Sequence, residues 1–320
     1  MKLFVQIPCL NEEETLPLVL KDIPHKIPGI NSIEILIINN GSTDRTVEVA
    51  KAHGVHHFVN HIGRRGLAQA FRDGLWYCLE HGADIIVNTD GDNQYPGASI
   101  ADLVQPILNN EADMVIADRQ VQTIDHFSPA KKFLQRLGTW VLNRAAGTRI
   151  PDAPSGFRAY SREAAIKLNV VTRFSYAMET LIQAGSKNLA IAAIPITVNP
   201  KTRESRLFKN TFEHVVKSGL AILRAFIMYQ PLVLFVSLGI LLLALGCIPF
   251  VHFLWLWLTH EPRGGFGSHH LQGLIVGSVL LMAAFVSFTL GVIADLTRIN
   301  RSLAEDDLEL TKRYVLSSRK

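Results

Sequence analysis

The chain has 320 residues, a formal net charge of +4 and 48% hydrophobic residues. This length predicts two domains, or one large domain with an appendage, rather than one small module. The charge is too small to indicate a nucleic-acid-binding protein. The basic residues gather near the most apolar part of the chain, which favours anionic lipid as their partner. Cys9, Cys78 and Cys247 lack the spacing of disulfides or metal ligands, so we interpret them as reduced thiols.

The first two thirds of the chain alternate short apolar runs with Gly, Asn, Asp and charged clusters, as expected of a soluble domain. Four runs predict buried strands: residues 3–7, 33–38, 84–89 and 113–117. Asn11 and Glu14 have the spacing of a capping box at the start of a helix, and a second helix is predicted over residues 46–53. This alternation predicts an α/β fold, in which helices cover both faces of a mostly parallel sheet.

Three polar clusters follow the first three predicted strands. In a mostly parallel sheet the ligand crevice lies at the carboxyl ends of the strands, so these clusters form the candidate site. The third cluster contains Asp90 and Asp92, whose carboxylates could converge on a divalent cation because Gly91 lets the chain bend. The alternative for such a D-x-D sequence is a solvated turn.

Two long runs in the last third of the chain, residues 231–258 and 271–294, contain no Asp, Glu, Lys or Arg. About 20 apolar residues span the bilayer core as a helix, so these runs predict a transmembrane hairpin. The alternative is a pair of buried helices in a soluble protein. Residues 207–229 combine apolar positions at helical spacing with basic residues, which predicts an amphipathic helix in the headgroup layer or an ordinary core-facing helix.

The distribution of Lys and Arg predicts the orientation of this hairpin. Basic residues precede the first run and follow the second, whereas the loop between them carries only Arg263. The positive-inside rule therefore places both ends in the cytoplasm. The apolar run at residues 3–7 is too short for a signal peptide. We expect an integral protein of a bacterial inner or plasma membrane with four parts: a cytoplasmic domain (1–206), the amphipathic helix (207–229), two transmembrane helices (230–296) and a cytoplasmic tail (297–320).

The sequences PCLNEEE, NNGSTD, DGDNQYP and DAPSGFR occur in this order before the two apolar runs. Together they resemble a family 2 glycosyltransferase of the Rossmann-like GT-A fold, in the branch that acts on dolichyl or polyprenyl phosphate. The resemblance implies that residues 1–206 form the catalytic domain. It also implies inverting transfer of a hexose from a UDP- or GDP-linked sugar to a polyprenyl phosphate (undecaprenyl or dolichyl), with Mg²⁺ or Mn²⁺ as cofactor.

The resemblance further implies the roles of individual residues. The nucleotide sugar would be bound by Pro8, Asn11, Glu12, Glu14, Asn39, Asn40, Ser42, Asp90 and Arg119. The metal would be held by Asp90, Asp92 and Gln94. The acceptor and its phosphate would be bound by Lys131, Lys132, Ser155, Arg203 and Arg206. The catalytic residues would be Asp92, Arg158 and, as the general base, Asp152.

Two features of these motifs qualify the resemblance. The amides Asn39 and Asn40 replace the acids of the usual D-D-G-S. An amide both donates and accepts, whereas a carboxylate only accepts, so the donor base is open between uracil and guanine. A phosphate monoester is largely ionised near neutrality, since its second pKa is about 6. Asp152 could therefore orient the acceptor or a cation instead of removing a proton.

Two alternative functions stay open at this stage. One is a glycosyltransferase that acts on another lipid or on a growing glycan, and the other is a catalytically silent membrane scaffold that kept the fold. The basic site residues could also be solvated surface groups, and residues 202–207 could simply attract anionic lipid. Homo-oligomerisation is compatible with the sequence.

Overall fold

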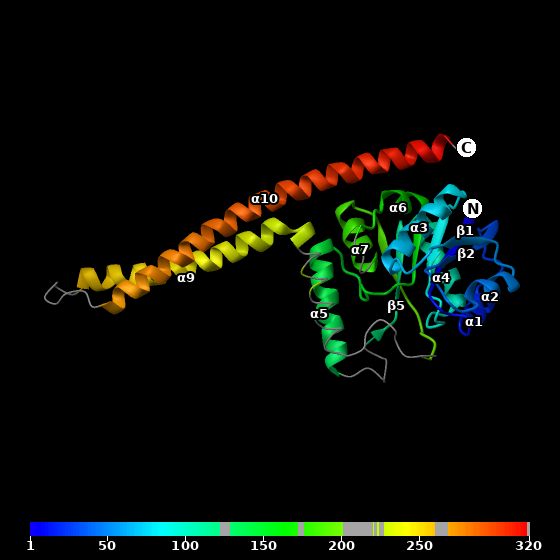
Figure 1. Cartoon of the computed structure of the whole chain (residues 1–320), viewed down its shortest axis with the longest axis horizontal. Coiled ribbons are helices and arrows are strands. Elements are labelled where there is room, and N and C mark those ends of the chain that lie inside the picture. Colours follow the sequence, from blue (N-terminus) through cyan, green and yellow to red (C-terminus); the bar gives the residue numbers. More distant parts are fainter. Residues whose placement is uncertain are drawn as a thin grey trace. The chain divides into compact units, whose positions relative to one another are not determined.

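The computed structural model describes residues 1–121, 129–171, 176–200, 220, 223, 227–259 and 268–318, without the side chains of residues 129–131, 133, 134 and 268–270. The chain forms two compact units: Met1–Ala225 together with Glu305–Lys320, and Phe226–Ala304. Figure 1 shows the elements of both units.

A mostly parallel sheet forms the centre of the first unit (Figure 1). Within the described residues its strand order is β3-β2-β1-β4-β6-β5-β7. Neighbouring strands pair parallel except β6, which runs antiparallel to both β4 and β5. The strands are β1 (Lys2–Cys9), β2 (Ser32–Asn39), β3 (His57–Asn60), β4 (Ile85–Asn88), β5 (Met114–Asp118), β6 (Arg158–Ser161) and β7 (Ile191–Pro195).

The four predicted strands are confirmed as β1, β2, β4 and β5, and the helix predicted over residues 46–53 is confirmed as α2 (Thr46–Ala52). The sequence analysis missed β3, β6 and β7. These strands have only four or five residues each, β6 begins with an arginine, and β7 contains two alanines, which are depleted in strands.

Helices cover both faces of the sheet, as predicted. Leu16 of α1 and Leu103 of α4 belong to one apolar cluster with Val5 of β1. The next residue of β1, Gln6, points to the opposite face. There α3 approaches so closely that a Cβ on Gly74 would lie 2.5 Å from Gln6 Oε1. Besides α2, the helices of this unit before α9 are α1 (Leu16–Asp22), α3 (Leu67–Glu80), η1 (Gly97–Ser99), α4 (Ile100–Leu108), α5 (Pro129–Ala146), α6 (Arg162–Lys167) and α7 (Tyr176–Ser186).

The capping box predicted at Asn11 and Glu14 is wrong. The helix α1 begins later, at Leu16, and its N-cap residue Thr15 makes no side-chain capping bond. Asn11 instead adopts a left-handed backbone with φ of 57°. Its Oδ1 atom accepts a hydrogen bond from Thr43 N at 2.8 Å. This competing bond to the loop after β2 removes the side chain from the helix start.

The described part of the second unit contains the helix α9 (Pro231–Thr259) and most of α10 (Ser268–Ser318). Both are long and apolar enough to cross a membrane, with mean hydropathies of 2.7 and 2.3 over their most apolar windows. Ser287 Oγ of α10 donates to Phe235 O of α9 at 2.8 Å. A Cβ on Gly239 would lie 2.6 Å from the Phe288 ring, so a glycine permits close packing of the two helices. Insertion and orientation stay predictions.

The helix α10 continues through most of the predicted tail, to Ser318. From Glu305 onward its residues belong to the first unit. Of the predicted amphipathic helix at 207–229, only Leu220, Leu223 and residues 227–229 are described, and these are helical. The rest lies outside the described residues, and the predicted domain boundaries stay a prediction.

Candidate active site

Three loops leave the sheet at its carboxyl edge. β1 pairs parallel with both β2 and β4, so the chain leaves these three strands on the same side. This is the edge at which α/β sheets bind ligands. The loops hold three of the four motifs, at residues 10–15, 40–45 and 89–95.

The first two loops are joined by hydrogen bonds. Asn11 N donates to Ser42 Oγ (3.0 Å), and Thr43 N donates to Asn11 Oδ1 (2.8 Å). Glu12 N donates to Thr46 Oγ1 (2.9 Å). Asn11 uses both its backbone and its side chain in these bonds. Asparagine tolerates the left-handed conformation and hydrogen-bonds locally, which explains its presence at this position.

The amides that replace the expected acids hold the second loop. Asn39 Oδ1 accepts a hydrogen bond from Ser42 N at 2.8 Å. Asn40 Oδ1 accepts one from Arg65 N at 2.9 Å and lies 3.3 Å from His61 Nδ1. Because a backbone N–H can only donate, the oxygen of Asn40 is directed toward Arg65. The NH₂ group of Asn40 is then the end of the amide that can donate to a ligand.

The D-x-D loop rests on the first loop. Thr15 Oγ1 lies 2.7 Å from Gly91 O and 2.9 Å from Glu12 Oε2. A Cβ on Gly91 would lie 3.2 Å from Glu12 Cγ, so glycine permits this approach. Asp92 Oδ1 accepts a hydrogen bond from Gln94 N at 3.2 Å. Thr15 therefore bonds the loop that carries the two acids, and Glu12 packs against it.

The DAPSGFR segment reaches the same place because β6 pairs with β4. Asn88 Nδ2 and Tyr176 Oη donate to Gly156 O at 3.0 and 3.2 Å. The backbone N–H of the same glycine donates to Tyr95 Oη at 3.3 Å. A Cβ on Gly156 would lie 2.7 Å from Tyr176 Oη and 3.6 Å from Asp90 Oδ2. The first acid of the D-x-D sequence and the last motif therefore meet at a glycine.

The sequence analysis did not assign Asn88, Tyr95 and Tyr176 to the site. Asn88 lies in the strand predicted over residues 84–89 and Tyr95 lies inside DGDNQYP, so both had a local signal, whereas Tyr176 had none. Burial raises the pKa of Tyr176 well above its ordinary value and also raises the pKa of Tyr95, and the charge of Asp90 acts in the same direction on both. Both hydroxyls therefore keep their protons at neutral pH.

Arg119 and Asp152 form a partly buried ion pair. Arg119 Nε lies 2.7 Å from Asp152 Oδ2, and Arg119 Nη2 lies 2.9 Å from Oδ1. The side chain of Asp152 is 2% exposed and that of Arg119 is 21% exposed. Burial by itself lowers the pKa of Arg119, but the hydrogen bonds to Asp152 and the charges of Asp152 and Asp90 oppose this effect, and the net pKa is raised. The guanidinium is permanently charged, and it engages both oxygens of Asp152.

Arg158 is completely buried at the start of β6. Its guanidinium donates to Ser155 O (2.7 Å), Ala153 O (2.6 Å) and Ala177 O (2.8 Å), and to Thr180 Oγ1 (2.9 Å). These acceptors lie in the loop before β6 and in α7. Arg158 therefore joins the loop that contains Asp152 to α7.

The other predicted site residues have varied placements. Pro8 is buried in β1, Glu14 is exposed before α1, and Lys132 is half-buried on α5. Ser155 Oγ is buried and has no hydrogen-bond partner within the described residues. Three of the predicted acceptor-binding groups lie outside the description: Arg203, Arg206 and the side chain of Lys131.

Asp90, Asp92 and Gln94 offer the hard oxygen ligands that Mg²⁺ and Mn²⁺ prefer. In the parts of the chain that the structure describes, no group of three or more His, Cys, Asp or Glu could hold a metal ion. Two acids still fit such an ion, because Mg²⁺ at nucleotide sites uses one or two carboxylates and takes its other ligands from phosphate and water. The metal ligands stay a prediction.

Comparison with known proteins places the chain in a family. The sequence model of glycosyl transferase family 2 matches residues 4–168. The UDP-N-acetylglucosamine–dolichyl-phosphate N-acetylglucosaminyltransferase of Methanococcus voltae is 27% identical over 216 residues, which cover 61% of this chain and 84% of the relative. The polyprenol monophosphomannose synthase of Mycolicibacterium smegmatis is 24% identical over 204 residues, which cover 60% of this chain and 76% of the relative.

The fold resembles that of solved glycosyltransferases. A crystal structure of glucosyl-3-phosphoglycerate synthase from Mycobacterium tuberculosis, in complex with Mn²⁺, UDP and glucosyl-3-phosphoglycerate, has a TM-score of 0.54 and 21% identity. The match covers 70% of this chain and 78% of that one. The family match spans just over half of the chain and the sheet topology agrees with it, so the chain belongs to glycosyl transferase family 2 and is a glycosyltransferase of the GT-A fold.

Proposed function

We propose that the protein transfers a hexose from a UDP- or GDP-linked sugar to a polyprenyl phosphate, with inversion at the anomeric carbon. The main support is the gathering of charged groups at the carboxyl edge of the sheet. Asp90 lies beside Gly156 and acts electrostatically on Arg119, which Asp152 holds. An edge that offers acids to a cation and an arginine to phosphate suits two phosphorylated substrates.

The nucleotide would lie along the first two loops. In support, the Methanococcus voltae relative is named for a UDP-linked donor, and the Mycobacterium tuberculosis structure contains UDP. The NH₂ group of Asn40 could donate to a carbonyl of the base, and both uracil and guanine carry one. The nucleotide is therefore to be identified by a binding screen.

A divalent cation, Mg²⁺ or Mn²⁺, would be held by Asp90, Asp92 and Gln94. Bound there, it would neutralise the charge that develops on the leaving nucleoside diphosphate. Structures of the Mycobacterium tuberculosis enzyme contain Mn²⁺ or Mg²⁺ together with UDP, which supports this proposal.

The acceptor phosphate would enter beside Ser155, with Lys131, Lys132, Arg203 and Arg206 as further cationic or polar contacts. Two relatives carry dolichyl phosphate or polyprenol in their names. The helices α9 and α10 are long enough to cross a bilayer. We therefore propose an integral protein of a bacterial inner or plasma membrane, with the catalytic domain and both chain ends in the cytoplasm.

The reaction would be a single displacement. An oxygen of the acceptor phosphate forms a bond to the anomeric carbon, while the bond from this carbon to the diphosphate oxygen breaks and the diphosphate keeps the electron pair. The acceptor is already largely ionised, because the second pKa of a phosphate monoester is about 6. We therefore assign Asp152 the role of orienting Arg119 rather than that of general base. Positioning and charge neutralisation would supply most of the rate.

The test is transfer in membranes that contain the full-length protein. Each radiolabelled UDP- or GDP-sugar is incubated with polyprenyl phosphate or with the matching polyprenol, with and without a chelator. The expected result is labelling of the phosphate form only, lost on chelation and restored by Mg²⁺ or Mn²⁺.

Three results would contradict parts of the proposal. Labelling of polyprenol without phosphate would overturn the acceptor. Labelling of another lipid or glycan alone would favour a different transferase of the same family. Absence of transfer with every donor would favour a silent scaffold.

A further inference from the structure

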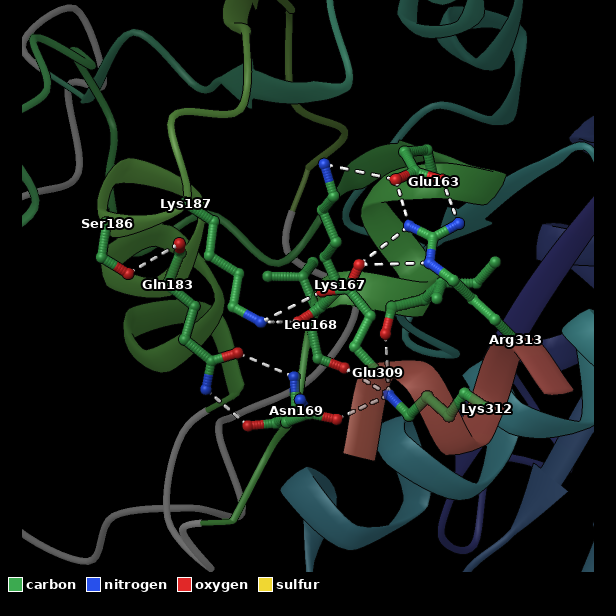
Figure 2. Close-up of polar contacts among 11 residues, drawn as sticks. Glu163, Lys167, Leu168, Asn169, Gln183, Ser186, Lys187, Glu309, Lys312 and Arg313 are labelled. Atoms are coloured by element: carbon green, nitrogen blue, oxygen red, sulfur yellow. Dashed lines mark hydrogen bonds and ion pairs between the residues drawn. The ribbon is translucent and has the colours of Figure 1, made fainter. Parts of the chain in front are cut away.

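The last turns of α10 close the end of α6 (Figure 2). Lys312 Nζ donates to Ile166 O (3.0 Å), Leu168 O (2.9 Å) and Asn169 Oδ1 (2.6 Å). An ammonium group has three protons, so these acceptors satisfy all of them. The last carbonyls of a helix have no partner within the helix, and α6 ends at Lys167. Lys312 therefore donates to one of the last carbonyls of α6 and to the two residues that follow Lys167.

Ion pairs hold the same turns of α10 to both α6 and α7 (Figure 2). Arg313 Nη1 lies 3.0 Å from Glu163 Oε2 on α6, and Arg313 Nη2 lies 2.8 Å from Glu309 Oε1 on α10 itself. The other oxygen of Glu309 lies 3.5 Å from Nζ of Lys187, the residue that directly follows α7. Opposite charges thus alternate across the contact, so each partner is neutralised there.

Asn169 connects Lys312 to α7. Asn169 N donates to Gln183 Oε1 (2.7 Å), and Gln183 Nε2 donates to Asn169 O (2.5 Å). Both residues are buried. A buried amide bonded in both directions fixes the separation of the two segments, because loss of either bond leaves a polar group without a partner. The position of Lys312 on Asn169 is therefore linked to the position of α7.

The other end of α7 lies at the candidate active site. Ala177 O and Thr180 Oγ1 accept hydrogen bonds from Arg158, and Tyr176 Oη donates to Gly156 O. Tyr176 also stacks on Phe71, with ring centroids 4.1 Å apart. The 11 residues of α7 span about 16 Å, since an α-helix rises 1.5 Å per residue. One short, buried helix is thus joined at Gln183, through Asn169, to Lys312 of α10, and at Tyr176 to the glycine beside Asp90.

We propose that Lys312 is a positioning residue for the glycosyltransferase reaction. By docking the end of α10 on Asn169 and Gln183, it sets the position of α7 and hence of the loop at residues 152–158, which α7 holds through Arg158 and Tyr176. The proposal rests on the proposed location of the site, but not on the identity of donor or acceptor. The helix that carries the second candidate membrane span would thereby support the catalytic loop.

The first test is hydrogen exchange on the full-length protein in lipid nanodiscs. In Lys312→Met, faster exchange is expected at residues 166–169 and also at residues 152–158. Lys21→Met, which removes an exposed lysine of α1, is the matched control and should change neither. Faster exchange at 166–169 with an unchanged 152–158 loop would overturn the proposal. If Lys312→Met does not fold, Glu309→Gln removes the neighbouring ion pairs and should produce the same pattern with smaller amplitude.

The second test is kinetic. A coupling of 0.5–2 kcal/mol corresponds to a fall in kcat of roughly two- to thirtyfold, with the KM for the donor little changed. Lys312→Arg keeps a donor cation and should restore part of kcat. The double variant Lys312→Met/Gln183→Met should lose no more kcat than the single variant with the larger loss, because both changes break the same connection. Additive losses or an unchanged kcat would overturn the coupling. Failure of wild-type protein to transfer any sugar would count against the proposed function, and the exchange result would still stand.

Discussion

Replacement of Arg158 by methionine distinguishes a structural role from a catalytic one. The side chain is completely buried, and its guanidinium serves three backbone carbonyls and one hydroxyl. Methionine fills much of the same space but donates nothing. Each buried acceptor left without a partner costs about 1–3 kcal/mol. The three carbonyls together then imply a loss of at least about 3 kcal/mol in the free energy of unfolding.

In a unit of this size, 1 kcal/mol shifts the midpoint of thermal unfolding by roughly 2–4 °C, so Arg158→Met should lower the midpoint by about 6–12 °C. The assay is thermal unfolding of the purified full-length protein, followed in parallel with transfer activity. Arg45→Met is the control, because the Arg45 side chain is 82% exposed, and its midpoint should move by less than about 2 °C.

Arg158→Lys sharpens the comparison. Lysine keeps the charge, but its single ammonium cannot reproduce the forked geometry of the guanidinium. We expect a lowered midpoint for this variant as well, and activity that falls in step with stability. A variant that unfolds like wild type but transfers no sugar would refute the structural role. Arg158 would then be a catalytic residue, as the sequence analysis predicted.

Three further predictions follow from the same contacts. Gly156→Ala should lower activity at least tenfold, which corresponds to about 1.4 kcal/mol of transition-state stabilisation, because its Cβ would lie 2.7 Å from Tyr176 Oη. Adding Tyr176→Phe to this variant should restore part of the activity. Absence of rescue would contradict the steric cause. Asp92→Ala should abolish transfer and metal-induced thermal stabilisation while the apo midpoint stays unchanged, with Asp102→Ala, an exposed acid of α4, as the control. The hydrogen bond from Arg313 lowers the pKa of Glu163, against the opposing effect of burial. The contribution of Glu163 to the docking of α10 on α6 is therefore present above the ordinary carboxyl pKa of 4.5 and is lost as the pH falls below this value. Hydrogen exchange of residues 305–318 should accelerate in that range beyond the intrinsic pH effect, and a Glu163→Gln variant with an equally steep response would refute this.

Local sequence was sufficient for the features that local physics controls. The continuous apolar runs of β1 and β2 predicted buried strands, because a strand covered on both faces needs such a run. The uncharged stretches of α9 and α10 predicted two long apolar helices, because about 20 consecutive apolar residues span the bilayer core as a helix. The D-x-D sequence could be placed at a strand end because a strand and its following loop are contiguous in the chain. The capping box failed where Asn11 found a partner 32 residues away.

Contacts between distant residues were decided only by the tertiary structure. Arg119 and Asp152 were separate candidates in the sequence, one to bind the nucleotide sugar and one to remove a proton. They lie 33 residues apart in the chain and form one ion pair. Tyr176 reaches Gly156 from α7, and Lys312 reaches Asn169 across 143 residues. Neither pairing leaves a periodic or compositional trace, because each depends on how the sheet and its helices pack. The sequence thus determined which chemical groups are available, and packing determined which of them touch.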